Sequence, residues 1–209
     1  MKYMFSKKNF LFLNIFIIAP SFSLAHHPMD GNMPLNWAEG LISGLAHPII
    51  GLDHIVFIAC LGIISSVYKK KILPAVIFIF SSALGSALIQ ANLYLPFFEY
   101  ILPASIIFIS ILVVYRNVLT QYSLYPLLFI SGILHGNAYG KSIIGAESSP
   151  IIFYFLGFMI IQFIIVTVVC LIFFKLNIYL KMKNLIVVGG LSMSIGFLIF
   201  FKQIFFGIN

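Results

Sequence analysis

The chain has 209 residues, of which 62% are hydrophobic and only 8% are charged, and its mean hydropathy is +1.12. A chain with so few charged residues has too little polar surface to coat a water-soluble globule. The composition therefore indicates a protein that lies in a lipid bilayer. The formal net charge of +7 does not predict nucleic-acid binding, because the basic residues stand one to three at a time in short loops between apolar runs.

The first 25 residues have the parts of an export signal. A basic start precedes an apolar run, which ends in the small-residue pattern Ser23-Leu24-Ala25. We expect cleavage after Ala25, so that the mature chain begins with His26 and His27 outside the membrane. The alternative is an uncleaved first helix, because the apolar stretch is long enough to anchor the chain.

Six apolar stretches follow, each close to the length of about 20 residues that crosses a bilayer. They predict helices at 39–66, 72–93, 98–115, 121–139, 150–175 and 184–206. The expected fold class is an all-α membrane protein with two parts. These are a signal peptide over residues 1–25 and one domain over residues 26–209, a six-transmembrane-helix bundle.

Basic residues are distributed unequally between the predicted loops. The loops after the first, third and fifth helices carry seven of them, and the opposite side carries only Lys141 and Lys202. Positively charged loops stay in the cytoplasm, so this bias predicts that the loops after the first, third and fifth helices are cytoplasmic. We expect a multi-pass protein of the cell (inner) membrane. Its mature N-terminus and its C-terminus are expected on the periplasmic, outer side.

Ionisable side chains inside the first predicted helix are the main functional signal. His47, Asp53 and His54 lie within eight residues, in a segment that must cross hydrocarbon. An ionisable side chain there costs at least about 2.5 kcal/mol and by default belongs to a functional pathway. A lone membrane histidine is often a helix-to-helix hydrogen-bond donor, but three such residues with an adjacent Asp-His pair favour a metal path.

The spacing of these residues leaves two arrangements open. In a straight helix His47 and His54 are about 10.5 Å apart along the axis, too far to share one metal ion. Pro48 removes a backbone donor, and Gly44 and Gly51 permit bending, so we expect a kink or a local break. Either the break folds the first histidine toward the Asp-His pair, or the residues form successive stations for an ion.

The available ligand types indicate which metals fit. Neutral imidazole with a few oxygen ligands suits nickel, cobalt or zinc better than a hard ion such as magnesium. His135 adds a third intramembrane imidazole, flanked by glycines that permit close helix approach; a hydrogen-bonding core histidine is the alternative. Cys60 and Cys170 lack CxxC spacing, which predicts packing residues and argues against a copper(I) path.

At these residues the sequence resembles the HupE/UreJ family of membrane proteins. His47, Asp53 and His54 match the family's signature in the first helix, including the His-Pro pair and the Gly-Leu before the aspartate. A second signature has two His-Gly pairs followed by an acid. His135 and its glycine match the first pair, whereas Tyr139 stands in place of the second histidine.

The resemblance also extends to two acids and to function. Glu147 looks like the later glutamate of a branch found in cyanobacteria, and Glu99 looks like a further family acid. The family is regarded as secondary permeases for nickel, with some members assigned to cobalt. No glycine-rich Walker loop for ATP is visible in the sequence. The resemblance therefore implies uptake of Ni²⁺ or Co²⁺ as cargo, with no permanently bound cofactor and with the lipid bilayer as the surrounding partner.

Cleavage after Ala25 would make His27 the second residue of the mature chain. Its imidazole, its backbone nitrogen and the free amine could then wrap a square-planar nickel or copper(II) ion. This resembles the N-terminal capture site of energy-coupled nickel and cobalt transporters, and His47 is the candidate fourth ligand. The alternative is a polar leader without this role.

The expected function is uptake of a divalent transition metal, most favourably nickel and next cobalt. The alternative is a membrane metal- or haem-binding accessory subunit for maturation of a hydrogenase- or urease-type metalloenzyme. We do not expect an enzyme, because a rhomboid-like protease needs a Gly-x-Ser-Gly setting that the chain lacks. The sequence gives no indication of oligomeric state. The candidate metal ligands are His26, His27, His47, Asp53, His54, Glu99, His135 and Glu147.

Overall fold

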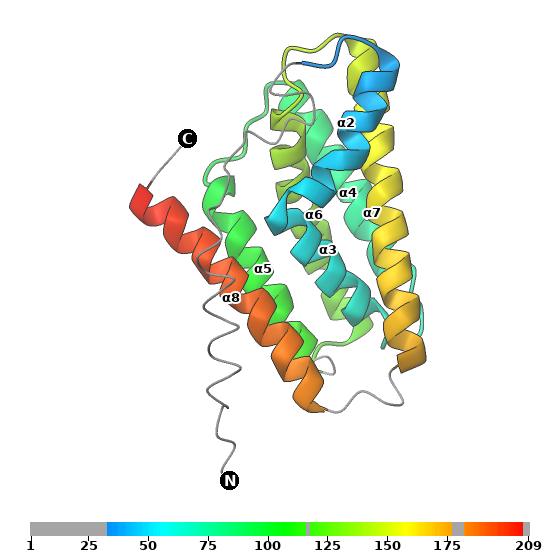
Figure 1. Cartoon of the computed structure of the whole chain (residues 1–209), viewed down its shortest axis with the longest axis vertical. Helices are drawn as coiled ribbons and strands as arrows, with labels where there is room; N and C mark the ends of the chain where they lie inside the picture. Colours follow the sequence, from blue (N-terminus) through cyan, green and yellow to red (C-terminus); the bar gives the residue numbers. More distant parts are fainter. Residues whose placement is uncertain (1–32, 116–117, 177–181, 207–209) are drawn as a thin grey trace.

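The computed structural model describes residues 33–115, 118–176 and 182–206. Within these ranges every regular element of secondary structure is an α-helix, as predicted (Figure 1). The predicted signal peptide, including its cleavage site, and the histidines His26 and His27 lie outside the described residues. The helices are α2 (Trp37–Ile50), α3 (Leu52–Ser65), α4 (Leu73–Gln90), α5 (Phe98–Val114), α6 (Gln121–Lys141), α7 (Ser148–Leu176) and α8 (Met182–Phe206).

Each predicted apolar segment is helical, and the first consists of two helices, α2 and α3. Three described helices are long and apolar enough to cross a membrane, namely α4, α7 and the Asn184–Phe205 part of α8. The bent pair of α2 and α3 is a fourth candidate if it counts as one span. α5 is a shorter apolar helix. The chain is therefore a multi-pass membrane protein, with three to four candidate spans by length and composition.

α2 and α3 meet at Gly51 with a bend of 76°. Gly51 has an extended backbone (φ −70°, ψ 108°), so the helix ends there although Pro48 lies inside α2. The helix does not bend at Gly44, although the sequence also allowed a bend there. A Cβ on Gly44 would lie 2.1 Å from the carbonyl oxygen of Tyr154, so this glycine instead lets α2 approach the backbone of α7.

α4 and α6 approach each other just as closely. A Cβ on Gly136 of α6 would lie 1.9 Å from the carbonyl oxygen of Ser82 in α4. Ser86 Oγ donates a hydrogen bond to the Gly136 carbonyl at 2.7 Å, and Gln90 Nε2 donates to the Gly140 carbonyl at 2.9 Å. Small residues and interhelical hydrogen bonds are the usual basis of helix pairing in lipid. This pairing fixes the position of the residue next to Gly136, which is His135.

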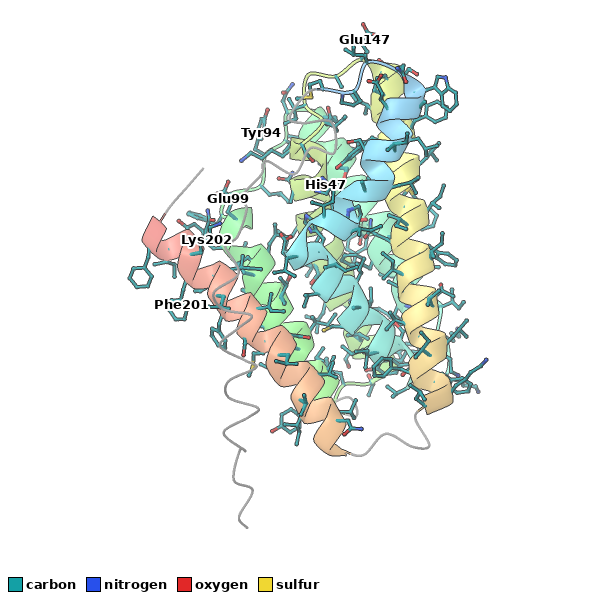
Figure 2. The ribbon with its side chains drawn as sticks, in the orientation of Figure 1. His47, Tyr94, Glu99, Glu147, Phe201 and Lys202 are labelled. Carbon is teal, nitrogen blue, oxygen red and sulfur yellow. The ribbon has the colours of Figure 1, made fainter. Side chains whose placement is uncertain are left out.

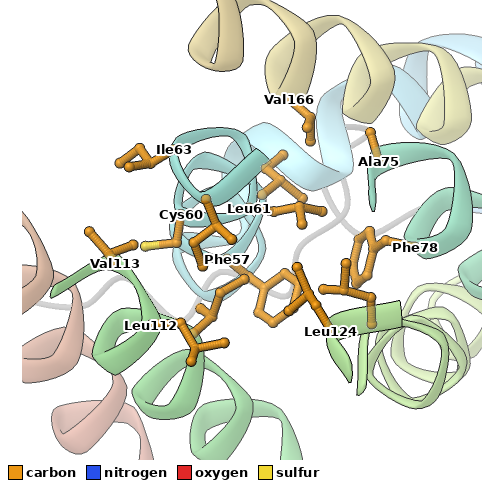
Figure 3. Close-up of a cluster of buried hydrophobic side chains, with 14 of the residues drawn as sticks. Phe57, Cys60, Leu61, Ile63, Ala75, Phe78, Leu112, Val113, Leu124 and Val166 are labelled. Carbon is orange, nitrogen blue, oxygen red and sulfur yellow. The ribbon is translucent and has the colours of Figure 1, made fainter. Parts of the chain in front are cut away.

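α3 is at the centre of the bundle and supplies much of the apolar core (Figure 3). Phe57 stacks on Phe78 of α4, with ring centroids 4.9 Å apart. Cys60 lies in the same core, and Cys170 of α7 is also buried; both are free thiols. Their burial is what the prediction of packing residues leads one to expect.

Candidate functional site

The break between α2 and α3 brings two histidines together. The ring centroids of His47 and His54 are 5.2 Å apart, and each residue is only 4% exposed. A straight helix would separate them by about 10.5 Å along its axis. Of the two arrangements that the sequence left open, the structure has the first, in which the break folds His47 toward the Asp-His pair. Figure 2 shows His47 in the interior of the bundle.

A third imidazole and a carboxylate complete the cluster. His135 of α6 is fully buried, with its ring centroid 5.8 Å from that of His54. Asp53 Oδ2 lies 3.9 Å from His54 Nδ1, and the Asp53 side chain is 22% exposed. Four candidate ligands from α2, α3 and α6 are thus neighbours. In the described part of the chain, however, no three histidine, cysteine or acidic side chains are arranged to hold a metal ion together.

Tyr139 lies between the three imidazoles. Its ring centroid is 4.3 Å from that of His54, 5.4 Å from that of His47 and 6.5 Å from that of His135. The other side of the ring stacks on Phe158 of α7 at 5.1 Å. Tyr139 is fully buried, and its hydroxyl has no hydrogen-bond partner among the described residues. The tyrosine therefore fills the space into which the three rings would have to converge.

Two serine hydroxyls contact the histidines. Ser105 Oγ of α5 lies 3.0 Å from His135 Nε2. Ser142 Oγ lies 3.5 Å from His47 Nδ1, at the long end of the hydrogen-bond range. Ser142 also donates to the Tyr139 carbonyl at 2.7 Å. Sequence reasoning did not find these contacts.

Aromatic side chains close the cluster on the side of the core. Phe57 and Phe78 contact His135, with ring centroids at 4.3 and 5.5 Å. The ring of Tyr154 lies 6.0 Å from that of His47. These apolar neighbours keep water away from the imidazoles, so electrostatic interactions there are stronger than at the surface.

The two predicted acids, Glu99 and Glu147, lie elsewhere. Glu99 accepts from Lys141 Nζ at 3.1 Å and from Gln203 Nε2 at 2.8 Å, which ties the start of α5 to the end of α6 and to α8. Glu147 is exposed in the turn between α6 and α7, at the upper end in Figure 2. None of the hydrogen bonds or ion pairs described for these two acids reaches a histidine.

These features define a multi-pass helical membrane protein with a buried histidine cluster at a broken helix. A family model described as HupE / UreJ protein matches residues 14–199. The match covers most of the sequence, so the chain belongs to the HupE/UreJ family. No curated protein and no solved structure was found to match the chain.

Proposed function

We propose that this protein is a secondary permease that takes up a divalent transition metal ion, nickel first and cobalt next, without ATP. The supporting observation is the break that folds His47 onto His54, beside His135, in the buried interior. Broken helices inside membrane bundles are frequent ion-binding elements of transporters. The HupE/UreJ family is associated with nickel and cobalt uptake or with metalloenzyme maturation, and imidazole ligands suit these metals.

The proposed topology has six spans, with α5 and α6 added to the candidates above and with α2 and α3 together as one span. A signal peptide over residues 1–25 would precede this six-helix domain over residues 26–209. The protein would lie in the inner membrane with the mature N-terminus and the C-terminus on the outer side.

The arrangement of the basic loops supports this orientation. Lys71 Nζ, after α3, lies 4.1 Å from the ring centroid of Phe174 near the end of α7. Tyr68 OH donates to the carbonyl of Leu119, in the connection between α5 and α6, at 3.1 Å. The chain just after α3, the described part of the connection between α5 and α6, and the end of α7 therefore lie at one end of the bundle, as expected for a cytoplasmic face.

The proposed route begins at the opposite end. Glu147 is exposed there and would collect the ion together with His26 and His27. Glu99 can bind an ion only after it leaves Lys141. The ion would then pass to His47, Asp53, His54 and His135. Rings about 5 to 6 Å apart suit transfer between neighbouring weak sites, which avoids trapping the ion at one strong site.

Uptake of radioactive nickel and cobalt by cells tests the proposal. Cells that express the protein should accumulate one of the two metals above cells with an empty vector, and an excess of the other metal should compete. The rival is an accessory subunit that binds metal or haem for metalloenzyme maturation. Uptake equal to the control, with a haem spectrum in the purified protein, would establish that rival instead.

Replacement of Tyr139 by phenylalanine tests its role in the route. The hydroxyl that is lost has no partner among the described residues, and an unsatisfied buried group costs about 1–3 kcal/mol. We therefore expect an unchanged or higher melting temperature. If the phenolic oxygen contacts the ion in transit, the nickel concentration for half-maximal uptake should rise. Tyr139→His, which restores the family residue, should lower it; no change in either variant would place Tyr139 outside the route.

A further inference from the structure

The two ring nitrogens of His135 have different surroundings. Nε2 lies 3.0 Å from Ser105 Oγ, whereas Nδ1 has no hydrogen-bond partner among the described residues. The residue is fully buried, so water from the surface does not reach the ring. A buried polar atom without a partner is rare in native structures and calls for an explanation.

The hydrogen of Ser105 determines which nitrogen of His135 carries a proton. Ser105 Oγ lies 2.6 Å from the carbonyl oxygen of Leu102, one turn earlier in α5, and donates to it. A serine hydroxyl has only one hydrogen, so toward His135 it can act only as an acceptor. The neutral imidazole must then donate from Nε2, and Nδ1 carries the lone pair.

We propose that Ser105 is a positioning residue that holds His135 as the Nε2–H tautomer and so presents Nδ1 as the metal-binding atom. The inference rests on the proposed function, since the metal is the cargo of the permease. It accounts for the bare Nδ1, which would receive its partner when an ion arrives. A hydrogen bond on one ring nitrogen commonly fixes the tautomer and orientation of a metal-binding histidine.

Packing prevents the His135 ring from turning over, which would exchange the positions of its two nitrogens. The Phe57 and Phe78 rings lie with centroids 4.3 and 5.5 Å from that of His135. A rotated imidazole would have to displace these core side chains, which also stack on each other. Loss of the Ser105 hydroxyl should therefore free the tautomer while leaving the ring in place.

Ser110 provides a matched control on the same helix. It is fully buried and donates to the carbonyl of Ile106 at 2.6 Å, much as Ser105 donates to Leu102. No hydrogen bond from Ser110 to a histidine is found in the described part of the chain. Ser110→Ala thus removes an equivalent hydroxyl from α5 without touching the cluster.

Nitrogen-15 NMR of histidine-labelled protein in lipid nanodiscs reads the tautomer directly. The chain has five histidines, and the His135 signals are identified by their loss in His135→Gln. At a mildly alkaline pH, where imidazole is neutral, the wild type and Ser110→Ala should show a protonated Nε2 and a bare Nδ1. Ser105→Ala should show a mixture of both tautomers. A protonated Nδ1 in the wild type, or an unchanged spectrum in Ser105→Ala, would overturn the inference.

Uptake measurements connect the tautomer to the metal. Ser105→Ala should raise the nickel concentration for half-maximal uptake by about tenfold, the lower end of the usual cost of losing a group that hydrogen-bonds to a metal-binding side chain, and Ser110→Ala should not. An equal effect of both variants would reduce Ser105 to a structural role. If the spectra change as expected but the wild type takes up no metal, the proposed function fails while the positioning of His135 by Ser105 stands.

Discussion

Replacement of His54 by alanine is expected to abolish saturable nickel uptake. Its ring is 5.2 Å from that of His47 and 5.8 Å from that of His135, so it connects the two other imidazoles. It also lies beside the Asp53 carboxylate. Even changes around the direct ligands of a metal commonly cost about 10- to 100-fold in affinity, so loss of this central ring should lower uptake by at least that much.

Ile58→Val is the matched control for this variant. Ile58 lies one turn further along α3 and is fully buried, and loss of one methyl group there costs about 0.5–1.5 kcal/mol. Uptake is measured with labelled nickel at equal membrane levels of each protein. Normal uptake by His54→Ala, or an equal loss in Ile58→Val, would contradict a direct role of the imidazole.

Gly136→Val is expected to prevent the correct packing of α4 against α6. The new Cβ would lie 1.9 Å from the backbone oxygen of Ser82, an atom that cannot move without shifting the helix. Overpacking typically costs about 1–3 kcal/mol and occasionally more. The variant also moves the neighbouring His135. We expect little folded protein by size-exclusion chromatography in detergent, a lower melting temperature in what remains, and no uptake.

Gly190→Val tests whether this effect depends on position. Gly190 is in α8, and a Cβ there meets no atom within 4 Å. The same substitution should therefore leave the yield of folded protein and its melting temperature close to wild type. Similar losses in both variants would show that α4 and α6 do not pack through Gly136 as described.

The helices were predictable because apolar runs of bilayer length are a local property of the sequence. The break near Pro48 and Gly51 was also predictable, since each residue disturbs a helix by its own covalent structure. The direction of the bend was not. It depends on how α2 packs against α7, where Gly44 meets the backbone of Tyr154, and no local pattern specifies that contact.

The candidate site was likewise predictable from the sequence only in part. Intramembrane histidines are unusual enough to be recognised from sequence, and His47, His54 and His135 prove to be neighbours. Buried serines are common in helices, so nothing in the sequence separated Ser105 from Ser110. The ion pair of Glu99 with Lys141 joins residues of different helices, and the prediction of Glu99 as an ion ligand could not take that partner into account.

The most direct test of the central claim is metal uptake into proteoliposomes that contain only the purified protein. We predict that nickel, or cobalt more weakly, enters the vesicles in a saturable manner without ATP, and that vesicles with His54→Ala behave like protein-free vesicles. If wild-type vesicles accumulate neither metal, under a proton gradient of either direction or none, the protein is not a permease for these ions and the accessory role becomes the better account.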